Sequence, residues 1–269
     1  MIKVNVGLED VKQVYDGPVG KLWEMLMGEE IHVGGPKETD VLAQKAGVTG
    51  NTRILDVCSA LGGPARHLAK RFGCQVTGLD ATQTMHEEAI LRTKKSNLEN
   101  LVDFRLGDAL EVPFAGETFD VVWGQDAWCY LTDKKRLIKE CHRVLKPGGI
   151  IAFTDWLNKK AASVQEQREL LTFMVFPYLE TLSGYENLLK DSGFEILEKE
   201  DLSDDFTNHI LFYQSMLQDL KDTISQNYGT EMFEAAEKGV ALWARASQEK
   251  KVSRGRIVGR KVTSEQPYH

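Results

Sequence analysis

Cysteine is scarce in this sequence, with only four residues in 269, and no two of them are arranged as C-x-x-C. We therefore expect no structural zinc, no bound metal and no disulfide framework, which is typical of a reduced, cytoplasmic protein. No apolar run approaches the roughly 20 residues that cross a bilayer, and Met1-Ile2-Lys3 leads into mixed polar sequence, so neither a membrane segment nor a signal peptide is predicted. A net charge of −7 argues against nucleic acid as a partner, because a phosphate backbone needs a positive surface.

Short apolar runs alternate with helical patterns from residue 53 onward. Strands are predicted over 53–57, 75–79, 102–106, 119–123 and 150–155, and helices over 64–72, 82–95 and 133–145. Such alternation predicts an α/β fold, in which a mainly parallel sheet carries helices on both faces. Before this region, residues 8–28 predict two short helices broken at Gly17-Pro18, and residues 37–47 predict a third. After it, we expect a helix over 183–191, a strand over 194–201, a helical stretch over 206–250 and a last strand over 255–262.

The segment from Ile54 to Pro64 is the most informative part of the chain. Its apolar run ends in Asp56, a loop of small residues follows, and Gly63-Pro64 opens a helix. A strand, a tight turn and a helix N-terminus in this order hold a nucleotide-like ligand against an α/β sheet. The fingerprint G-x-G-x-x-G is absent, which argues against a nicotinamide-dependent dehydrogenase.

Polar residues follow the predicted strands at their carboxyl ends, where an open parallel sheet binds its ligands. In strand order they are Asp56, Asp80, Asp108, Gln125-Asp126 and Asp155. Asp80 ends the second strand, where it is well placed to accept hydrogen bonds from both hydroxyls of a ribose. The turn Gly107-Asp108-Ala109 would bind an adenine through its carboxylate and a backbone N–H.

Taken in order, these pieces resemble the class I S-adenosylmethionine (SAM) dependent methyltransferases. The resemblance covers residues 53–155 and includes LDVCSALGG (55–63), VTGLD (76–80), GDA (107–109), the stretch from Pro113 to Trp123, and RVLKPGG (143–149). Within that superfamily the chain looks most like the small-molecule branch with glycine/sarcosine/dimethylglycine N-methyltransferases and phosphoethanolamine methyltransferases, through residues 28–35, 62–66, 125–127 and 154–156. Sugar O-methyltransferases and C-methyltransferases of natural-product and sterol type share much of this pattern.

The resemblance implies a Rossmann-like fold with a seven-stranded, mostly parallel sheet, an antiparallel last strand and a helical lid. It divides the chain into an N-terminal helical lid (1–50), a SAM-binding core (51–157) and a region of acceptor-side helical insertions and final strands (158–269). It also implies SAM as the cofactor and S-adenosylhomocysteine as its product, no metal, a small-molecule acceptor, and a monomer or homodimer. The SAM-binding residues that it implies are Asp56, Cys58, Ala60, Gly62, Asp80, Ala81, Asp108, Ala109 and Gln125.

Two departures from the family pattern bear on the ligand. Cys58 and Ala60 stand where the first loop of the family usually has glycine, so either the loop shifts slightly, or the affinity for SAM is modest, or the ligand is not ordinary SAM. Tyr130 stands where a histidine commonly follows the Gln-Asp-Ala segment, and the family often has a tyrosine near the position of Trp23. The acid/base pair of the phosphobase enzymes is therefore not carried over, which argues against that substrate.

The acceptor side of the site is expected to be rich in aromatic residues. The catalytic candidates are Tyr130, Gln125 and His32, and the acceptor-binding candidates are Trp23, Trp128, Tyr130, Trp156, Tyr178 and His209. An aromatic box would attract a cationic methylated amine through cation–π contacts, while packing in the core or the lid is the other interpretation of these rings. Arg66 is expected on a solvated helix face, and Arg254, Arg256 and Arg260 on an exposed strand edge.

We therefore expect a methyltransferase that moves a methyl group from SAM to a small polar acceptor by in-line displacement, first to an amine nitrogen of the glycine/sarcosine type. O- or C-methylation of a secondary metabolite is the alternative. A protein that binds SAM or a related nucleoside without catalysis is an alternative of another class, motivated by Cys58 and Ala60, whereas Asp80 and Asp108 argue against it.

Overall fold

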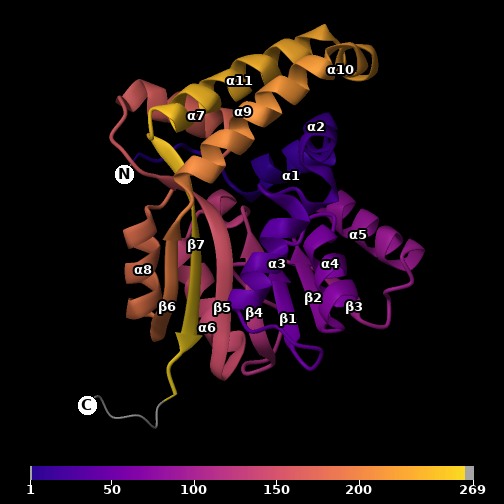
Figure 1. Cartoon of the computed structure of the whole chain (residues 1–269), viewed down its shortest axis with the longest axis vertical. Coiled ribbons are helices and arrows are strands. Elements are labelled where there is room, and N and C mark those ends of the chain that lie inside the picture. Colours follow the sequence, from indigo (N-terminus) through magenta and orange to yellow (C-terminus); the bar gives the residue numbers. More distant parts are fainter. Residues whose placement is uncertain (1, 264–269) are drawn as a thin grey trace.

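A computed structural model describes residues 2–263 and places a seven-stranded sheet at the centre of the chain (Figure 1). The strands are β1 (Arg53–Val57), β2 (Gln75–Asp80), β3 (Val102–Leu106), β4 (Phe119–Gln125), β5 (Leu145–Asn158), β6 (Phe194–Asp201) and β7 (Val252–Lys261). Their order is β3-β2-β1-β4-β5-β7-β6, with β1 to β5 parallel and β7 antiparallel to both neighbours. The predicted α/β fold with its antiparallel last strand is confirmed.

Most helices begin and end close to the residues that the sequence indicates, but the predicted helical stretch over 206–250 forms three helices, and the helix Val164–Met174 was not predicted as a separate helix. The helices are α1 (Leu8–Asp16), α2 (Pro18–Met27), α3 (Gly35–Lys45), α4 (Gly63–Phe72), α5 (Gln83–Lys95), α6 (Lys134–Val144), α7 (Val164–Met174), α8 (Leu182–Asp191), α9 (Ser203–Asp219), α10 (Lys221–Tyr228) and α11 (Thr230–Gln248), with 3-10 turns η1 (Gly28–Glu30) and η2 (Trp128–Tyr130). Pro18 stands in the first turn of α2, where its missing N–H costs no hydrogen bond. None of the described helices is both long and apolar enough to span a membrane.

The inner strands β1, β4, β5 and β7 are buried on both faces, since successive side chains point to opposite sides of the sheet and helices cover each side. Ile54, Val121 and Val258 join a cluster with α3, α4 and α5 on one face. The residues next to these three in the sequence belong to a second buried cluster, which packs against α6 and α8 on the other face of the sheet. These near-continuous apolar strands are typical of a parallel sheet with helices on both sides.

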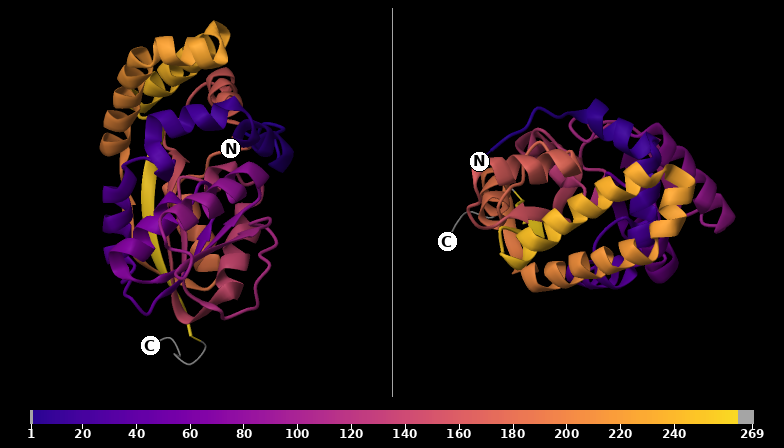
Figure 2. Two further views of the ribbon diagram at one scale, coloured as in Figure 1. Left: turned by 90° about the vertical axis from the view of Figure 1, so that its right-hand side faces the viewer. Right: turned by 90° about the horizontal axis from the view of Figure 1, so that it is seen from above.

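A helical cap lies beyond the carboxyl ends of β1, β4 and β5. Figure 1 shows α9 and α11 crossing above the sheet with α7, and α1 and α2 beside them; Figure 2 shows α9 and α11 running alongside each other. The cap has its own buried cluster, in which Trp156 at the end of β5 packs edge-on against Trp243 of α11, with ring centroids 4.9 Å apart. This cap and the sheet edge enclose the space where a ligand would bind.

The arginines of β7 correct one expectation. Because β7 lies between β5 and β6, Arg254 is 0% exposed and Arg256 is 6% exposed, so the predicted exposed edge is wrong for both. Nε of Arg254 donates to Asp126, and Arg256 pairs with Glu38 on α3 through two 2.8 Å hydrogen bonds. Arg260, near the end of the strand, is exposed as expected.

Candidate active site

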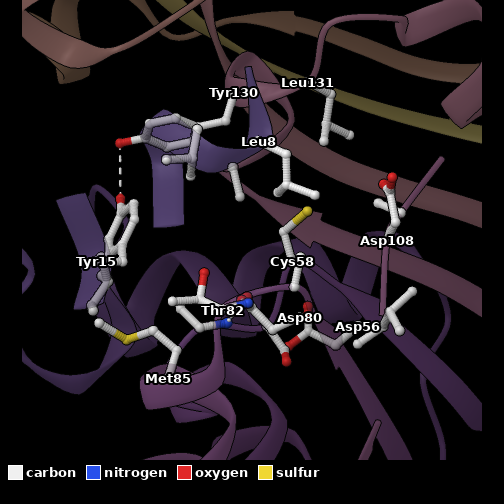
Figure 3. A pocket seen from close by; sticks show the side chains of 18 of the residues that line it. Leu8, Tyr15, Asp56, Cys58, Asp80, Thr82, Met85, Asp108, Tyr130 and Leu131 are labelled. Atoms are coloured by element: carbon white, nitrogen blue, oxygen red, sulfur yellow. Dashed lines mark hydrogen bonds between the residues drawn. The ribbon is translucent and has the colours of Figure 1, made fainter. Parts of the chain in front are cut away.

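A pocket opens at the carboxyl ends of β1 to β4, below α1 (Figure 3). It collects most of the residues that the sequence nominates for SAM: Asp56, Cys58, Ala60, Asp80, Ala81, Asp108, Ala109 and Gln125. Gly62 lies outside its lining, at the N-terminus of α4, with a φ of +69°. A Cβ there would meet the ring of Phe104 at 2.5 Å, so this position requires glycine.

The loop after β1 takes a backbone conformation that favours glycine at two positions without glycine. Cys58 has a φ of +66° and Ala60 a φ of +44°. The N–H groups of Cys58 and Ser59 donate to the carbonyl oxygen of Leu79, at 2.7 and 3.1 Å, which ties the loop to β2. The loop therefore keeps left-handed dihedral angles at Cys58 and Ala60 despite their side chains, at a cost of about 1–2 kcal/mol for each residue.

Asp80 is held rigidly by the backbone around it. Its Oδ2 accepts a 2.8 Å hydrogen bond from the N–H of Ala60, and its Oδ1 accepts a 2.9 Å bond from the N–H of Thr82. Burial raises the pKa of this carboxyl, while the two N–H donors act in the opposite direction. Each oxygen retains a lone pair, so the group can still accept from two neighbouring hydroxyls.

Four residues that line the pocket carry buried polar atoms with no hydrogen-bond partner among the described residues. These atoms are Oδ2 of Asp56, Oε2 of Glu30, Oγ of Ser59 and Nε2 of Gln125. Asp56 is 2% exposed, and its pKa is raised to about 8 by burial first and then by the carboxylates of Asp80 and Glu30. Unpaired groups of this kind are costly and indicate a ligand that supplies the missing partners.

The orientation of Gln125 is set by two donors behind it. Oε1 accepts from the hydroxyl of Thr39 at 3.0 Å and from the indole N–H of Trp123 at 3.1 Å. The amide NH₂ is thereby left to the ligand. His32 is 1% exposed and supports this arrangement, since its Nε2 lies 3.1 Å from Oγ1 of Thr39.

Tyr15 and Tyr130 meet at the side of the pocket, as the dashed line in Figure 3 shows. Their hydroxyl oxygens are 2.8 Å apart, and their rings pack edge to face. Burial raises the pKa of both phenols above the usual value, so both are neutral at pH 7. Tyr15 was missed by the sequence analysis; its signal was its place on the apolar face of the helix that ends at Gly17-Pro18.

The nominated acceptor-side residues separate into two groups. Trp23, His32, Tyr130 and Trp156 line a small cavity that shares Tyr15 and Tyr130 with the pocket. Trp128 is instead stacked on Phe153 in the core and donates to the carbonyl of Val57 at 3.3 Å. Tyr178 packs on the ammonium of Lys134, and His209 lies on α9 with Nδ1 2.9 Å from the carbonyl oxygen of Asp205. These last three do not line the pocket.

Arg66 lies in the loop–helix junction and is 6% exposed, so the predicted solvated position is wrong. Its guanidinium donates to the carbonyl of Leu61 and to the carboxylate of Glu29, each at 2.6 Å. The arginine therefore fastens η1 against the loop after β1. No group of three or more His, Cys, Asp or Glu side chains within residues 2–263 is arranged to hold a metal ion.

Residues 55–153 match the model of a family described as "Methyltransferase domain". The match runs from β1 to β5. The chain is 29% identical over 81% of its length to the glycine/sarcosine/dimethylglycine N-methyltransferase of Actinopolyspora halophila, and 33% identical over 66% of its length to a sterol 24-C-methyltransferase of Saccharomyces cerevisiae. These matches span 39% and 48% of the two curated relatives.

The likeness to solved structures extends to the cap. Phosphoethanolamine N-methyltransferase 2 of Haemonchus contortus, in complex with S-adenosyl-L-methionine, superposes with a TM-score of 0.86 at 23% identity, over 95% of this chain and 60% of that one. At this level of identity the likeness demonstrates a shared fold. The helices around the pocket therefore belong to the same architecture as the sheet.

Proposed function

We propose that this protein is an enzyme that transfers the methyl group of SAM to a small-molecule acceptor, first of all to an amine nitrogen. The observation that carries the proposal is a set of buried polar atoms without hydrogen-bond partners among the described residues, in the lining of the pocket that also contains Asp80 and Asp108. SAM has an amino acid at one end and a nucleoside at the other, so its polar groups could supply partners for these atoms.

Different residues of the chain would bind different parts of SAM. Asp80 would accept from the ribose hydroxyls, and Asp108 with Ala109 would hold the adenine. Asp56 and Glu30 offer carboxylate oxygens to the ammonium of the methionine part, and the amide NH₂ of Gln125 offers a donor to its carboxylate. When bound, SAM supplies a methyl group on a sulfonium, which is a reactive electrophile.

Methyl transfer needs a nucleophile close to the methyl carbon and aligned with the breaking bond. The hydroxyls of Tyr15 and Tyr130 line the pocket at its border with the aromatic residues, where they can hydrogen-bond an acceptor and orient its lone pair. Both phenols remain neutral at pH 7, so they position the nucleophile rather than act as phenolate bases. A bound amine loses its proton to water or to a modest base.

Nitrogen is the first candidate for two reasons. The aromatic faces of Trp23, Tyr130 and Trp156 stabilise the positive charge that develops on an amine, with cation–π contacts of about 0.5–2 kcal/mol each. The names of two relatives describe methylation of glycine, sarcosine or dimethylglycine. These amines therefore belong in a screen for the methyl acceptor.

C- or O-methylation of an apolar metabolite is the second candidate. It is favoured by the absence of a lysine or arginine side chain, within the described residues, from the lining of the small cavity next to Tyr130. A free amino acid would present a carboxylate that needs such a partner.

Two measurements test the proposed function. Calorimetric titration should show that SAM and S-adenosylhomocysteine bind. Asp80→Ala should weaken this binding at least tenfold, because the ribose hydroxyls of the ligand would lose their hydrogen-bond acceptor. Asp103→Ala, at an exposed position of β3, should leave binding unchanged. Mass spectrometry of a panel of amines, phenols and carbon nucleophiles incubated with SAM should then detect a methylated product. Tight binding without any product would support the non-catalytic alternative, and no binding of either ligand would contradict the proposal.

A further inference from the structure

Two small cavities lie in the helical cap, and the nearer one adjoins the pocket at Tyr15 and Tyr130. A first cavity of about 20 Å³ shares Tyr15, Ile31, Asp126 and Tyr130 with the pocket. A second cavity of about 10 Å³ lies beyond it, and the two share Trp23, Met27, Trp156 and Met174. We call these two cavities and their lining the aromatic chamber. Their shared walls place them one after the other between the pocket and helices α9 and α11.

The aromatic chamber is tightly closed in this structure. Each cavity has room for roughly one water molecule, which needs about 10–15 Å³. The walls shared by the two cavities include the flexible thioether side chains of Met27 and Met174, which can repack around an irregular guest. A ligand therefore enters by displacing side chains. Which ligand binds favourably depends on the chemistry of the residues that line the chamber.

Charge is almost absent from these walls. Among the described residues, Asp126 is the only acidic side chain in the lining of either cavity, and no lysine or arginine lines them. Asp126 is already satisfied, because Oδ1 accepts from Nε of Arg254 at 2.7 Å and Oδ2 accepts from the N–H of Val33 at 2.8 Å. The ring nitrogens of His32 face Val33 and Thr39. Among residues 2–263, no Lys or Arg side chain in the lining offers a free countercharge to a carboxylate.

Two tryptophans that line the chamber have indole N–H groups without a hydrogen-bond acceptor among the described residues. Trp156 is 4% exposed and Trp243 is 2% exposed, and Nε1 of each lacks a hydrogen-bond partner among the described residues. Trp123 and Trp128 provide the contrast, since their buried N–H groups donate to Gln125 and Val57. An orphaned buried donor is costly, and two on packed rings that line the same cavity indicate that a ligand supplies the acceptors.

We infer that the methyl acceptor is an uncharged, largely apolar molecule whose oxygen atoms accept hydrogen bonds from the indole N–H groups of Trp156 and Trp243. A carbonyl, hydroxyl or ether oxygen on a ring system or branched chain has this chemistry. The inference rests on the proposed function and narrows it: if the reacting atom is a nitrogen, that nitrogen is carried by an apolar body and not by a free amino acid.

The test uses a pair of probes that differ in one oxygen, 2-propionylnaphthalene and 2-propylnaphthalene, added to the full chain saturated with S-adenosylhomocysteine. In spectra of protein with ¹⁵N-labelled indoles, the ketone should move the Trp156 and Trp243 N–H signals downfield, and the hydrocarbon should not. The spectra of Trp156→Phe and Trp243→Phe assign the signals. Unmoved signals with bound ketone would overturn the inference.

Affinity gives a second, independent readout. Each Trp→Phe change removes the donor and keeps a ring, so it should weaken ketone binding at least fivefold and leave hydrocarbon binding within twofold. Phe176→Leu, a chamber residue without a donor, should weaken both probes equally. Equal losses for both probes in Trp156→Phe and Trp243→Phe would overturn the inference, as would saturable binding of sarcosine in place of the ketone.

The two proposals fail in different ways. If S-adenosylhomocysteine does not bind, the proposed function fails, while the indole signals still report whether the chamber takes the ketone. If S-adenosylhomocysteine binds and the ketone moves neither indole signal, the methyltransferase proposal stands and the acceptor class is wrong.

Discussion

Nε of Arg254 donates a 2.7 Å hydrogen bond to Oδ1 of Asp126, joining two residues that are 128 positions apart in the chain. Arg254 is fully buried, and its Nη2 also donates to the hydroxyl of Thr154 at 3.0 Å. Asp126 holds the N–H of Val33 with its other oxygen and has a left-handed φ of +55°. One buried ion pair thus ties together β7, the end of β4 and the segment around Val33 that precedes α3.

Arg254→Met should lower the free energy of unfolding by about 3–5 kcal/mol, because it leaves the buried carboxylate of Asp126 without its countercharge. Urea unfolding followed by circular dichroism measures the change. Arg260→Met is the matched control, since that arginine lies on the same strand and is exposed, and it should change stability by no more than about 0.5 kcal/mol. Similar values for both variants would show that the buried pair contributes little.

Asp56 should make the ligand-free protein less stable as the pH rises. Its pKa is about 8 in the folded state against about 3.9 in an unfolded chain. At pH values between these two, Asp56 keeps its proton in the folded state and loses it in the unfolded chain. Its contribution to the free energy of unfolding is therefore fully present below about pH 4 and is lost as the pH rises through 8. Asp56→Asn should therefore flatten the stability curve between pH 5 and 8 and raise the melting temperature at pH 8.

Although Asp56→Asn should stabilise the ligand-free protein at pH 8, it should weaken the binding of SAM. The substitution keeps the size of the side chain but removes the charge that would pair with the ammonium of SAM. Wild-type protein should release protons on binding SAM at pH 7, because the cation favours ionised Asp56; calorimetry in buffers of different ionisation enthalpy measures this release. Proton release that survives in Asp56→Asn would assign it to another group.

The Tyr15–Tyr130 pair should couple energetically. Tyr130→Phe should lower turnover with little change in SAM affinity, because the lost hydroxyl faces the acceptor side. Each single Tyr→Phe change leaves one part-buried hydroxyl without its partner, at a cost of about 0.5–1.5 kcal/mol, whereas the double change removes both partners. The double variant should therefore be more stable than the sum of the single effects predicts. Strict additivity, or full turnover in Tyr130→Phe, would contradict these roles.

Ala60→Gly should stabilise the protein although it removes a methyl group. Relief of the left-handed conformation is worth about 1–2 kcal/mol, and the greater freedom of glycine in the unfolded chain takes back about 0.4–1 kcal/mol. Thermal unfolding should therefore show a net gain of about 0.5–1 kcal/mol, with SAM affinity equal or better. Ala235→Gly, on the exposed face of α11, should instead cost about 1 kcal/mol.

Local sequence patterns were sufficient to predict the core of the fold and the side of the site that contains the strand-end aspartates. Asp56, Asp80 and Asp108 follow apolar runs that form strands, and parallel strands bring their carboxyl ends to one edge, so their meeting in one pocket follows from strand order. The break at Gly17-Pro18 likewise separates two helices because proline lacks an N–H and glycine ends a helix cheaply. These are effects of neighbouring residues, which the sequence displays directly.

The acceptor side was less predictable because it depends on contacts between distant segments. Trp23 and Trp156 line the aromatic chamber, whereas Trp128, an aromatic residue in an equally suggestive position, is stacked in the core on Phe153. Composition alone does not distinguish these cases. The direction of each ring depends on how the cap helices pack over the sheet.

The sequence by itself determined the order of strands and helices, the acids at the strand ends and the small-residue loop, since each depends on residues that are neighbours in the chain. Only the tertiary structure decided that β7 inserts between β5 and β6, which buries Arg254 and Arg256 and converts a basic run into internal ion pairs. It also decided that Tyr15 meets Tyr130 across 115 positions. Burial and pairing across such distances are products of the packed fold, because a side chain's partners are set by the surfaces that fold against it.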